Sequence, residues 1–207
     1  MKSKLIFIYI SMLIYGVISQ SCTDGCGGPN PNRYKITDFE VSLNELINSN
    51  NPFFGSNPIE NSKAHYTSFA IDFKGQTESY FSSTFSLPKL GIISRAYACS
   101  PVMPTTIEKV TDIRVFCDQT IIDSYPENTN IASLFDIVFH PNESGFEQMS
   151  LEDYLAIEQP ATGFFTLILN TQPAQQNTYV FRVEYEQDGV DMDYFEYTSE
   201  AVTITID

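Results

Sequence analysis

Apolar and polar residues alternate over most of the chain after Arg33, and this period of two restricts the fold more than any other feature. Such alternation predicts strands with one buried face and one wet face. The clearest case is TYVFRVEYE, in which Tyr179, Phe181, Val183 and Tyr185 share one face. The pattern recurs elsewhere and predicts these further inward residues: Thr37, Phe39, Val41, Leu43, Phe69, Ile71, Phe73, Ile113, Val115, Cys117, Phe135, Ile137, Phe139, Val202, Ile204 and Ile206.

A continuous apolar run, Phe164–Leu169 (FFTLIL), predicts a central strand that is covered on both faces. Turn-forming residues separate the strand candidates, and Asp188-Gly189 predicts a hairpin near the C-terminus. At least seven strand candidates with few helices indicate an all-β fold. We expect an antiparallel immunoglobulin-like β-sandwich of about seven or more strands with one or two short helices.

Two segments carry a helix signal. Ser150 followed by Asp153 in MSLEDYLAIE resembles a capping box, which satisfies backbone N–H groups at the start of a helix. The segment Ser42–Ile47 (SLNELI) has a mixed pattern and is the second candidate. The segment Asn48–Ser62 is rich in Asn, Ser and Pro and predicts a long surface loop.

The N-terminus has the form of a secretory signal. Lys2 and Lys4 precede a thirteen-residue apolar run, Leu5–Val17, and a small polar stretch that ends at Cys22. The run is shorter than the roughly 20 apolar residues that a membrane-spanning helix needs. The alternative is a buried core helix, but such a helix has polar residues on one face and this run has almost none.

The stretch from Ser19 to Cys22 (SQSC) resembles the lipobox of bacterial lipoproteins, although Ser19 stands where that motif usually has leucine. The resemblance implies that residues 1–21 are removed and that the acylated thiol of Cys22 anchors the chain to a lipid bilayer. Residues 22–33, rich in Gly, Pro and Asn, then form a flexible tether, and residues 34–207 form one β-sandwich domain. Ordinary secretion, with Cys22 free or paired to Cys26, is the alternative.

Cys99 and Cys117 lie inside the expected domain, eighteen residues apart. In an exported protein such a pair favours a disulfide, which would stabilise the fold by roughly 3 kcal/mol in the chain-entropy model. Two buried thiols that stay reduced are the alternative. Cys26 is left over in the tether.

The full chain has a net charge of −15, and removal of residues 1–21 takes away Lys2 and Lys4 and makes it more negative. Charge of this sign repels phosphate groups, so nucleic acid is not an expected partner. The acidic residues are spread along the chain, as on a solvated surface.

The sequence offers few groups for catalysis or metal binding. His65 and His140 lie beside strand candidates, and no nucleophile motif, phosphate loop or zinc motif accompanies them. Asp188, Asp191 and Asp193 gather in EQDGVDMD as candidate calcium ligands, although their spacing does not match the EF-hand loop. The alternative is that Asp188 forms the hairpin turn and the other acids face water. We expect no other cofactor.

Tyr194, Phe195 and Tyr197, close to the expected C-terminal hairpin, are candidate recognition aromatics for a sugar or a protein surface. The alternative is packing against neighbouring strands, which is the commoner role of tyrosine in a sheet.

The signal ending SQSC, the tether, and the segments YKITDFEVSL, FFTLILNTQP and TYVFRVEYEQDG together resemble small Bacteroidetes lipoproteins classed under domains of unknown function. The resemblance implies a cell-envelope location and an immunoglobulin-like sandwich, and it carries no catalytic residues over. We expect a membrane-anchored binding or structural module that contacts an envelope protein or a glycan, without catalytic activity. An accessory subunit of a nutrient-uptake complex and a hydrolase with two carboxylates are the alternatives.

Overall fold

The computed structural model describes residues 33–48, 51–52, 55–80, 106, 108–142, 145–189 and 193–206. The chain divides into two compact units, and the unit of residues 34–79 and 106–207 contains nearly all of these residues. The predicted signal peptide and Cys22 lie outside the described residues, as does the tether apart from Arg33.

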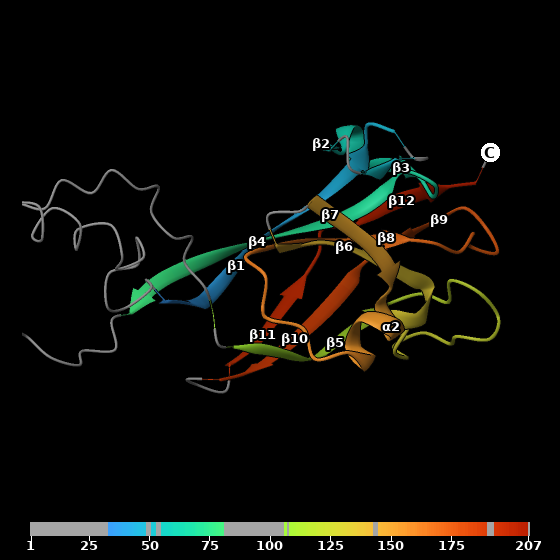
Figure 1. Cartoon of the computed structure of the whole chain (residues 1–207). Helices are drawn as coiled ribbons and strands as arrows, with labels where there is room; N and C mark the ends of the chain where they lie inside the picture. Colours follow the sequence, from blue (N-terminus) through green and yellow to red (C-terminus); the bar gives the residue numbers. More distant parts are fainter. Residues whose placement is uncertain are drawn as a thin grey trace, which may run out of the picture. The chain divides into compact units, whose positions relative to one another are not determined.

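The described strands form three sheets (Figure 1). The first sheet has the order β2 (Ser56–Pro58), β1 (Arg33–Leu46), β4 (Phe69–Tyr80), β8 (Phe164–Leu169), β6 (Phe135–Asn142) and β7 (Gly145–Ser150). The second sheet has the order β11 (Asp193–Thr198), β10 (Phe181–Asp188) and β5 (Lys109–Cys117). The third sheet joins β3 (Lys63–His65), β12 (Val202–Thr205) and β9 (Asn177–Tyr179).

The strand order is that of an immunoglobulin-like sandwich. Strands β1, β4, β5, β6, β8, β10 and β11, taken in chain order, correspond to strands A to G. The first sheet then contains the order A-B-E-D and the second sheet the order C-F-G, as in seven-stranded immunoglobulin domains. Figure 1 shows β1, β4, β8 and β6 in one layer and β5, β10 and β11 in the other. The predicted all-β sandwich is confirmed.

Aromatic side chains from both sheets form the centre of the core. The rings of Phe73 and Phe165, on neighbouring strands of the first sheet, stack with their centroids 4.5 Å apart. Tyr185 of the second sheet stacks on Phe165 at 5.8 Å, and Phe39 meets Phe165 edge-on at 5.6 Å. Pairs of this kind contribute about 0.5–1.5 kcal/mol each beyond the burial of their area.

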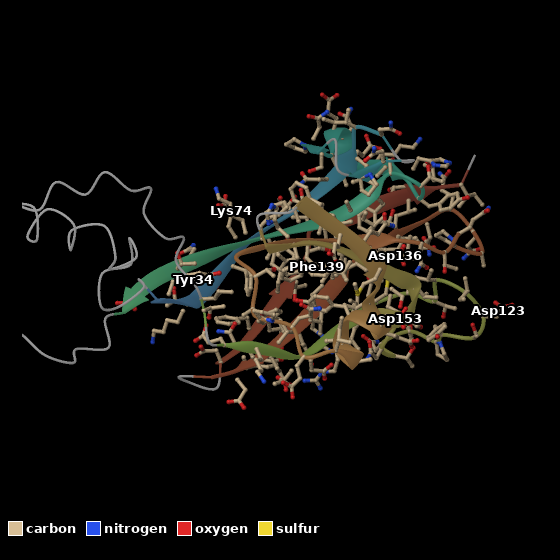
Figure 2. The ribbon with its side chains drawn as sticks, in the orientation of Figure 1. Tyr34, Lys74, Asp123, Asp136, Phe139 and Asp153 are labelled. Atoms are coloured by element: carbon tan, nitrogen blue, oxygen red, sulfur yellow. The ribbon has the colours of Figure 1, made fainter. Side chains whose placement is uncertain are left out.

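The alternation predicted most of the buried face. Figure 2 shows Phe139 between the two layers, whereas Lys74 projects away from β4. The apolar run Phe164–Leu169 is a central strand, as predicted, because β8 lies between β4 and β6. The following predicted inward residues are at most 2 % exposed: Phe69, Ile71, Phe73, Ile113, Val115, Cys117, Phe135, Ile137, Phe139, Tyr179, Phe181, Val183, Tyr185, Val202 and Ile204.

The first half of β1 departs from the predicted pattern. The alternation predicts Thr37 on the inward face, but Thr37 is exposed and Ile36 is fully buried instead. The backbone N–H of Phe39 donates to the carboxylate of Asp38 (2.8 Å), a local bond that competes with the regular ladder. The predicted face points to the core only from Phe39 onward.

The helix predicted at Ser42–Ile47 is wrong, because the chain up to Leu46 continues β1. Leu43 packs against the core, and Asn44 and Leu46 are buried on the opposite face. β1 pairs with β2 on one side and β4 on the other, so sheet packing outweighs a weak local preference for helix.

The helix predicted from Ser150 and Asp153 is confirmed as α2 (Leu151–Ala156). The hydroxyl oxygen of Ser150 accepts a hydrogen bond from the backbone N–H of Asp153 (3.0 Å) and so caps the first turn. The segment predicted as a loop before β3 is partly ordered into secondary structure, because it contains β2 and a 3-10 helix, η3 (Glu60–Ser62). A second 3-10 helix, η4 (Ala132–Leu134), precedes β6.

Cys117 is 2 % exposed and carries a free thiol, and Cys99 lies outside the described residues. Cys117 is thus not disulfide-bonded in this structure, which agrees with the buried-thiol alternative for this one of the two cysteines. Burial, together with a smaller contribution from the neighbouring Asp118 carboxylate, raises the pKa of the Cys117 thiol to about 12. Because the thiolate is the reactive form, the folded protein holds Cys117 unreactive at neutral pH.

We expect Cys117 to resist alkylation by iodoacetamide in the folded protein at pH 8 and to react fully after unfolding in guanidinium without reductant. With a pKa of about 12, roughly one thiol in ten thousand is ionised at pH 8. The readout is the mass of the peptide that contains Cys117. A Cys117 that stays protected after unfolding and reacts only after reduction would be disulfide-bonded, and the free thiol would then be wrong.

We also expect Phe165→Ala to lower the free energy of unfolding by about 3–5 kcal/mol, because it empties the centre of the aromatic core. Phe164→Ala is the matched control, since Phe164 is the neighbouring residue and is 39 % exposed on the opposite face. Its cost is expected to be about 1 kcal/mol or less. Guanidinium unfolding followed by far-UV circular dichroism measures both, and equal costs would contradict the described packing.

Candidate functional site

β11 is an edge strand with one open side. β10 pairs with β11 in antiparallel register, from Arg182 opposite Thr198 to Gln187 opposite Asp193. No described residue makes a backbone hydrogen bond to the other side of β11. An open strand edge presents N–H and C=O groups that can pair with another chain.

Three residues of β11 direct their backbone groups toward the open side. The N–H of Ser199 donates to the carbonyl oxygen of Phe181 (2.8 Å). This bond shows which residues of β11 direct their backbone groups toward β10. Because hydrogen-bonded pairs alternate along antiparallel strands, every second residue of β11 bonds to β10 in the same way. The N–H and C=O groups of Tyr194, Glu196 and Thr198 therefore point away from β10.

Other edges of the sandwich differ from β11. On the far side of the second sheet, the N–H of Ile131 donates to the carbonyl oxygen of Val115 (2.7 Å), so a loop covers part of β5. β2 is three residues long and ends in Pro58. β7 is an edge strand as long as β11, but residues 146–148 are all exposed, so an added strand would meet little buried apolar surface there.

A left-handed turn leaves the edge of β11 open. β3 pairs in parallel with β12, with Lys63 opposite Thr203, and so covers the strand that follows β11. A straight extension of β3 toward its N-terminus would run along β11. Instead Asn61 (φ 56°) and Ser62 (φ 52°) adopt left-handed backbone conformations and turn the chain away.

A groove lies at this turn, between β1 and the junction of β11 with β12. Its volume is about 270 Å³, close to the lower limit of small-molecule pockets. Most of its lining is apolar, and the full set is Val41, Ser42, Leu43, Ile59, Ser62, Tyr197, Glu200, Ala201 and Val202. We call these nine residues the edge groove. Val41 and Leu43 also pack against the core, so the edge groove reaches the side of the sandwich interior.

Two glutamates set the charge of this site. Burial and the Glu200 carboxylate both raise the pKa of Tyr197, so the charge of Glu200 acts within the edge groove. On β11 the hydroxyl of Tyr194 donates to Glu196 Oε2 (2.9 Å), and this bond is the main cause of the raised pKa of Tyr194. No Lys or Arg is among the nine residues of the edge groove, so the site is negatively charged.

The predicted recognition aromatics do not form one surface. Tyr194 is 51 % exposed on the outer face of β11, whereas Phe195 and Tyr197 are half-buried on the opposite face. Phe195 meets Phe39 edge-on at 5.5 Å and therefore takes the packing role that was the alternative. Tyr197 lines the edge groove. The ring of Tyr194 lies on the outer face of β11, outside this groove.

The structure describes only two of the three predicted calcium ligands, Asp188 and Asp193. Asp188 is exposed at the end of β10, and Asp191 lies outside the described residues. Asp193 accepts a hydrogen bond from the side-chain amide of Gln187 (3.0 Å). In the described part of the chain, no three acidic, histidine or cysteine side chains converge on a common point. The calcium site stays a prediction.

A buried polar cluster at one end of the sandwich was not predicted. Glu108 and Gln187 are both fully buried. The amide nitrogen of Gln187 lies 3.2 Å from the carbonyl oxygen of Ile36 and 3.3 Å from Glu108 Oε2. The N–H of Ile36 donates to the same Glu108 oxygen (3.0 Å). Together with its bond to Asp193, Gln187 ties β1, β10 and β11 to the residue before β5.

Gly189 belongs to the same end of the sandwich. A Cβ at this position would lie 2.7 Å from Cα of Glu108, closer than real side chains approach. The glycine of the predicted Asp188-Gly189 turn is therefore also a packing requirement. Gln187 stands at the next inward-facing position after those of TYVFRVEYE. A polar residue at a position where the alternation predicts burial was the sequence feature that could have revealed the cluster.

The outer face of the first sheet exposes a second group of rings. Phe146 is 43 % exposed, and the ring of His140 contacts it with centroids 5.1 Å apart and the two planes at 83°. Because the two ring planes are perpendicular, the pair does not form one flat surface on which a sugar ring could stack across both rings. His65, the other histidine, contacts the hydroxyl of Thr67 (2.8 Å) in the turn before β4. These exposed rings therefore give weak support for a glycan-binding surface. The open edge of β11 gives stronger support for binding a protein segment.

No family model, curated protein or solved structure matches this chain. The description of the site therefore rests on the residues of this chain alone. Within the described part of the chain, no helix has the length and apolar character that crossing a bilayer requires.

Proposed function

We propose that this chain is a membrane-anchored binding module of the cell envelope, and that it takes up an extended segment of a partner protein as an added strand along β11. The observation that carries the proposal is the open edge of β11 beside a mostly apolar groove. Peptides add to such edges through main-chain hydrogen bonds, while pockets for alternate side chains provide specificity. The function is one of binding, and no catalytic step is part of it.

The dimensions of the site limit the affinity. β11 has six residues, so about six residues of a partner would match its length. One or two apolar side chains buried in the edge groove would contribute about 1.5–3 kcal/mol each, and each main-chain hydrogen bond about 0.5–1.5 kcal/mol. Association costs at least about 4 kcal/mol. These magnitudes favour a dissociation constant in the micromolar range or weaker.

The membrane anchor in this proposal comes from the sequence around Cys22. A charged start, an apolar run and the ending SQSC support removal of residues 1–21 and acylation of the new N-terminal cysteine. Several acyl chains hold a protein to a bilayer where a single chain gives only marginal binding. The Gly- and Pro-containing stretch 22–33 would then leave the sandwich free to meet partner proteins of the same compartment.

We expect Cys22→Ala to move the protein from the membrane pellet to the soluble fraction of lysed cells, because the acylated thiol is lost. Cys26→Ala is the matched control, since it removes a thiol four residues away without touching the proposed anchor. Immunoblots of the two fractions provide the measurement. A Cys22→Ala protein that stays in the pellet would contradict the anchor.

We expect Thr198→Pro to weaken peptide binding about tenfold, because proline removes an outward N–H and its ring blocks an added strand. The probe is the tightest peptide selected from a displayed library of random nine-residue sequences against the purified protein, measured by fluorescence anisotropy. Thr198→Ala is the matched control: it also loses the hydroxyl but keeps the N–H, and its affinity is expected within about twofold of the parent.

Thermal unfolding establishes whether the proline variant is folded. A second measurement needs no variant: the bound peptide should slow hydrogen–deuterium exchange at the amides of Tyr194, Glu196 and Thr198. Peptides that bind the proline and alanine variants equally, or that protect amides elsewhere, would refute the site. A library that yields no peptide bound at β11 would refute it as well.

A further inference from the structure

We infer that the segment added to β11 is basic on its outward face, with Lys or Arg at alternate positions and apolar residues between them. This inference rests on the proposed function and names the chemistry of its partner. Two observations support it: the carboxylates beside the open edge, and the apolar lining of the edge groove.

Glu196 is the central outward residue of the open edge. Its side chain is 46 % exposed, so it is accessible to a residue on a neighbouring strand. Its described partners leave its charge largely uncompensated. The Tyr194 hydroxyl that donates to it is neutral, and Arg182 Nη1 lies 3.8 Å away and also bonds to Glu184. A Lys or Arg directly across from Glu196 would form the favourable cross-strand pair, whereas a Glu or Asp there would be repelled.

The ion-pair network on the outer face of the second sheet contains more acid than base. Two arginines and four carboxylates meet there: Arg114, Arg182, Asp112, Glu184, Glu186 and Glu196. Both guanidinium groups already contact carboxylates of their own sheet, for example Arg114 Nε and Asp112 at 3.2 Å. A strand added at β11 would extend this face and meet its excess negative charge.

The inward positions of the added strand meet a different surface. Phe195 and Tyr197 point inward from β11, and Val41 and Leu43 face the edge groove from β1. Apolar side chains at alternate positions of the segment would therefore be buried. Glu200 is the one charged residue of the edge groove, and its negative charge disfavours an acidic residue at these inward positions.

A second copy of the same chain is the competing occupant. Antiparallel pairing of β11 with β11 of another molecule around a two-fold axis would bring two Glu196 side chains toward each other across the new ladder. Each chain also has a net charge of −15. Charge complementarity therefore favours a basic segment of another protein over self-association.

The test measures the binding of two acetylated and amidated heptapeptides to the full-length protein. KVKVKVK has the basic and apolar pattern proposed for the partner, and EVEVEVE has the opposite charge. We expect KVKVKVK to bind at least about tenfold more tightly than EVEVEVE at low salt, with slowed amide exchange at Tyr194, Glu196 and Thr198. The difference should shrink in high salt, because exposed charges are screened. Glu196→Lys should reduce or reverse the preference. Glu147→Lys, the same charge change on the exposed strand β7, should leave it unchanged.

The outcomes separate the two claims. Equal binding of both peptides at β11, or equal effects of the Glu196→Lys and Glu147→Lys changes, would overturn the basic partner and leave the open edge as a binding site. Failure of every peptide, including the library peptides, to protect the β11 amides would overturn both. A dimer in analytical ultracentrifugation that Thr198→Pro abolishes would identify a second copy as the occupant and overturn the inference.

Discussion

The stack of Phe165 on Tyr185 is the contact on which the rest of the structure depends, because it joins the two sheets at the centre of the core. The ring of Phe39 of β1 contacts both rings edge-on, and it also contacts Phe195 of β11 in this way. One ring therefore sets the spacing between β1 and β11 across the two layers. The next inward residues of β1, beginning with Val41, then line the edge groove. The site is a continuation of the core toward an open side of the sandwich.

The open edge follows from how the chain covers its last strands. The parallel pairing of β3 covers β12, and the turn at Asn61 and Ser62 ends that cover before β11 is reached. Exposed strand edges are a liability that proteins usually limit by short strands, proline, charge or a covering loop. β2 is short and ends in Pro58, and a loop covers part of β5. β11 combines an edge that no described strand or loop covers with an adjacent apolar groove, which is the combination that strand addition uses.

Sequence reasoning recovered the fold better than the site, for a physical reason. Burial on one face is a local property of alternating residues, so the inward phase of strands such as β10 could be read directly from the chain. The phase of β1 before Phe39 and the helix signal at Ser42–Ile47 were misjudged, because tertiary pairing and the local Asp38 bond decided them. An open edge has no local signature at all, since it depends on which distant strands pair. Tyr197 was identified as a candidate for its ring, whereas its role in the site comes from its position in the edge groove, which residues of distant strands also line.

Glu196 opposes the pairing of identical strand edges, which would be favoured in a membrane-anchored protein with an open edge. Tethering to a bilayer confines copies to a surface and raises their effective concentration, which favours even weak pairing between identical edges. A carboxylate in the middle of β11 opposes that pairing, because two copies would face like charge with like charge. The same carboxylate favours an incoming segment of opposite charge. Under the proposed membrane anchor and strand addition, a single side chain would account both for an edge that stays open and for the chemistry of the segment that closes it.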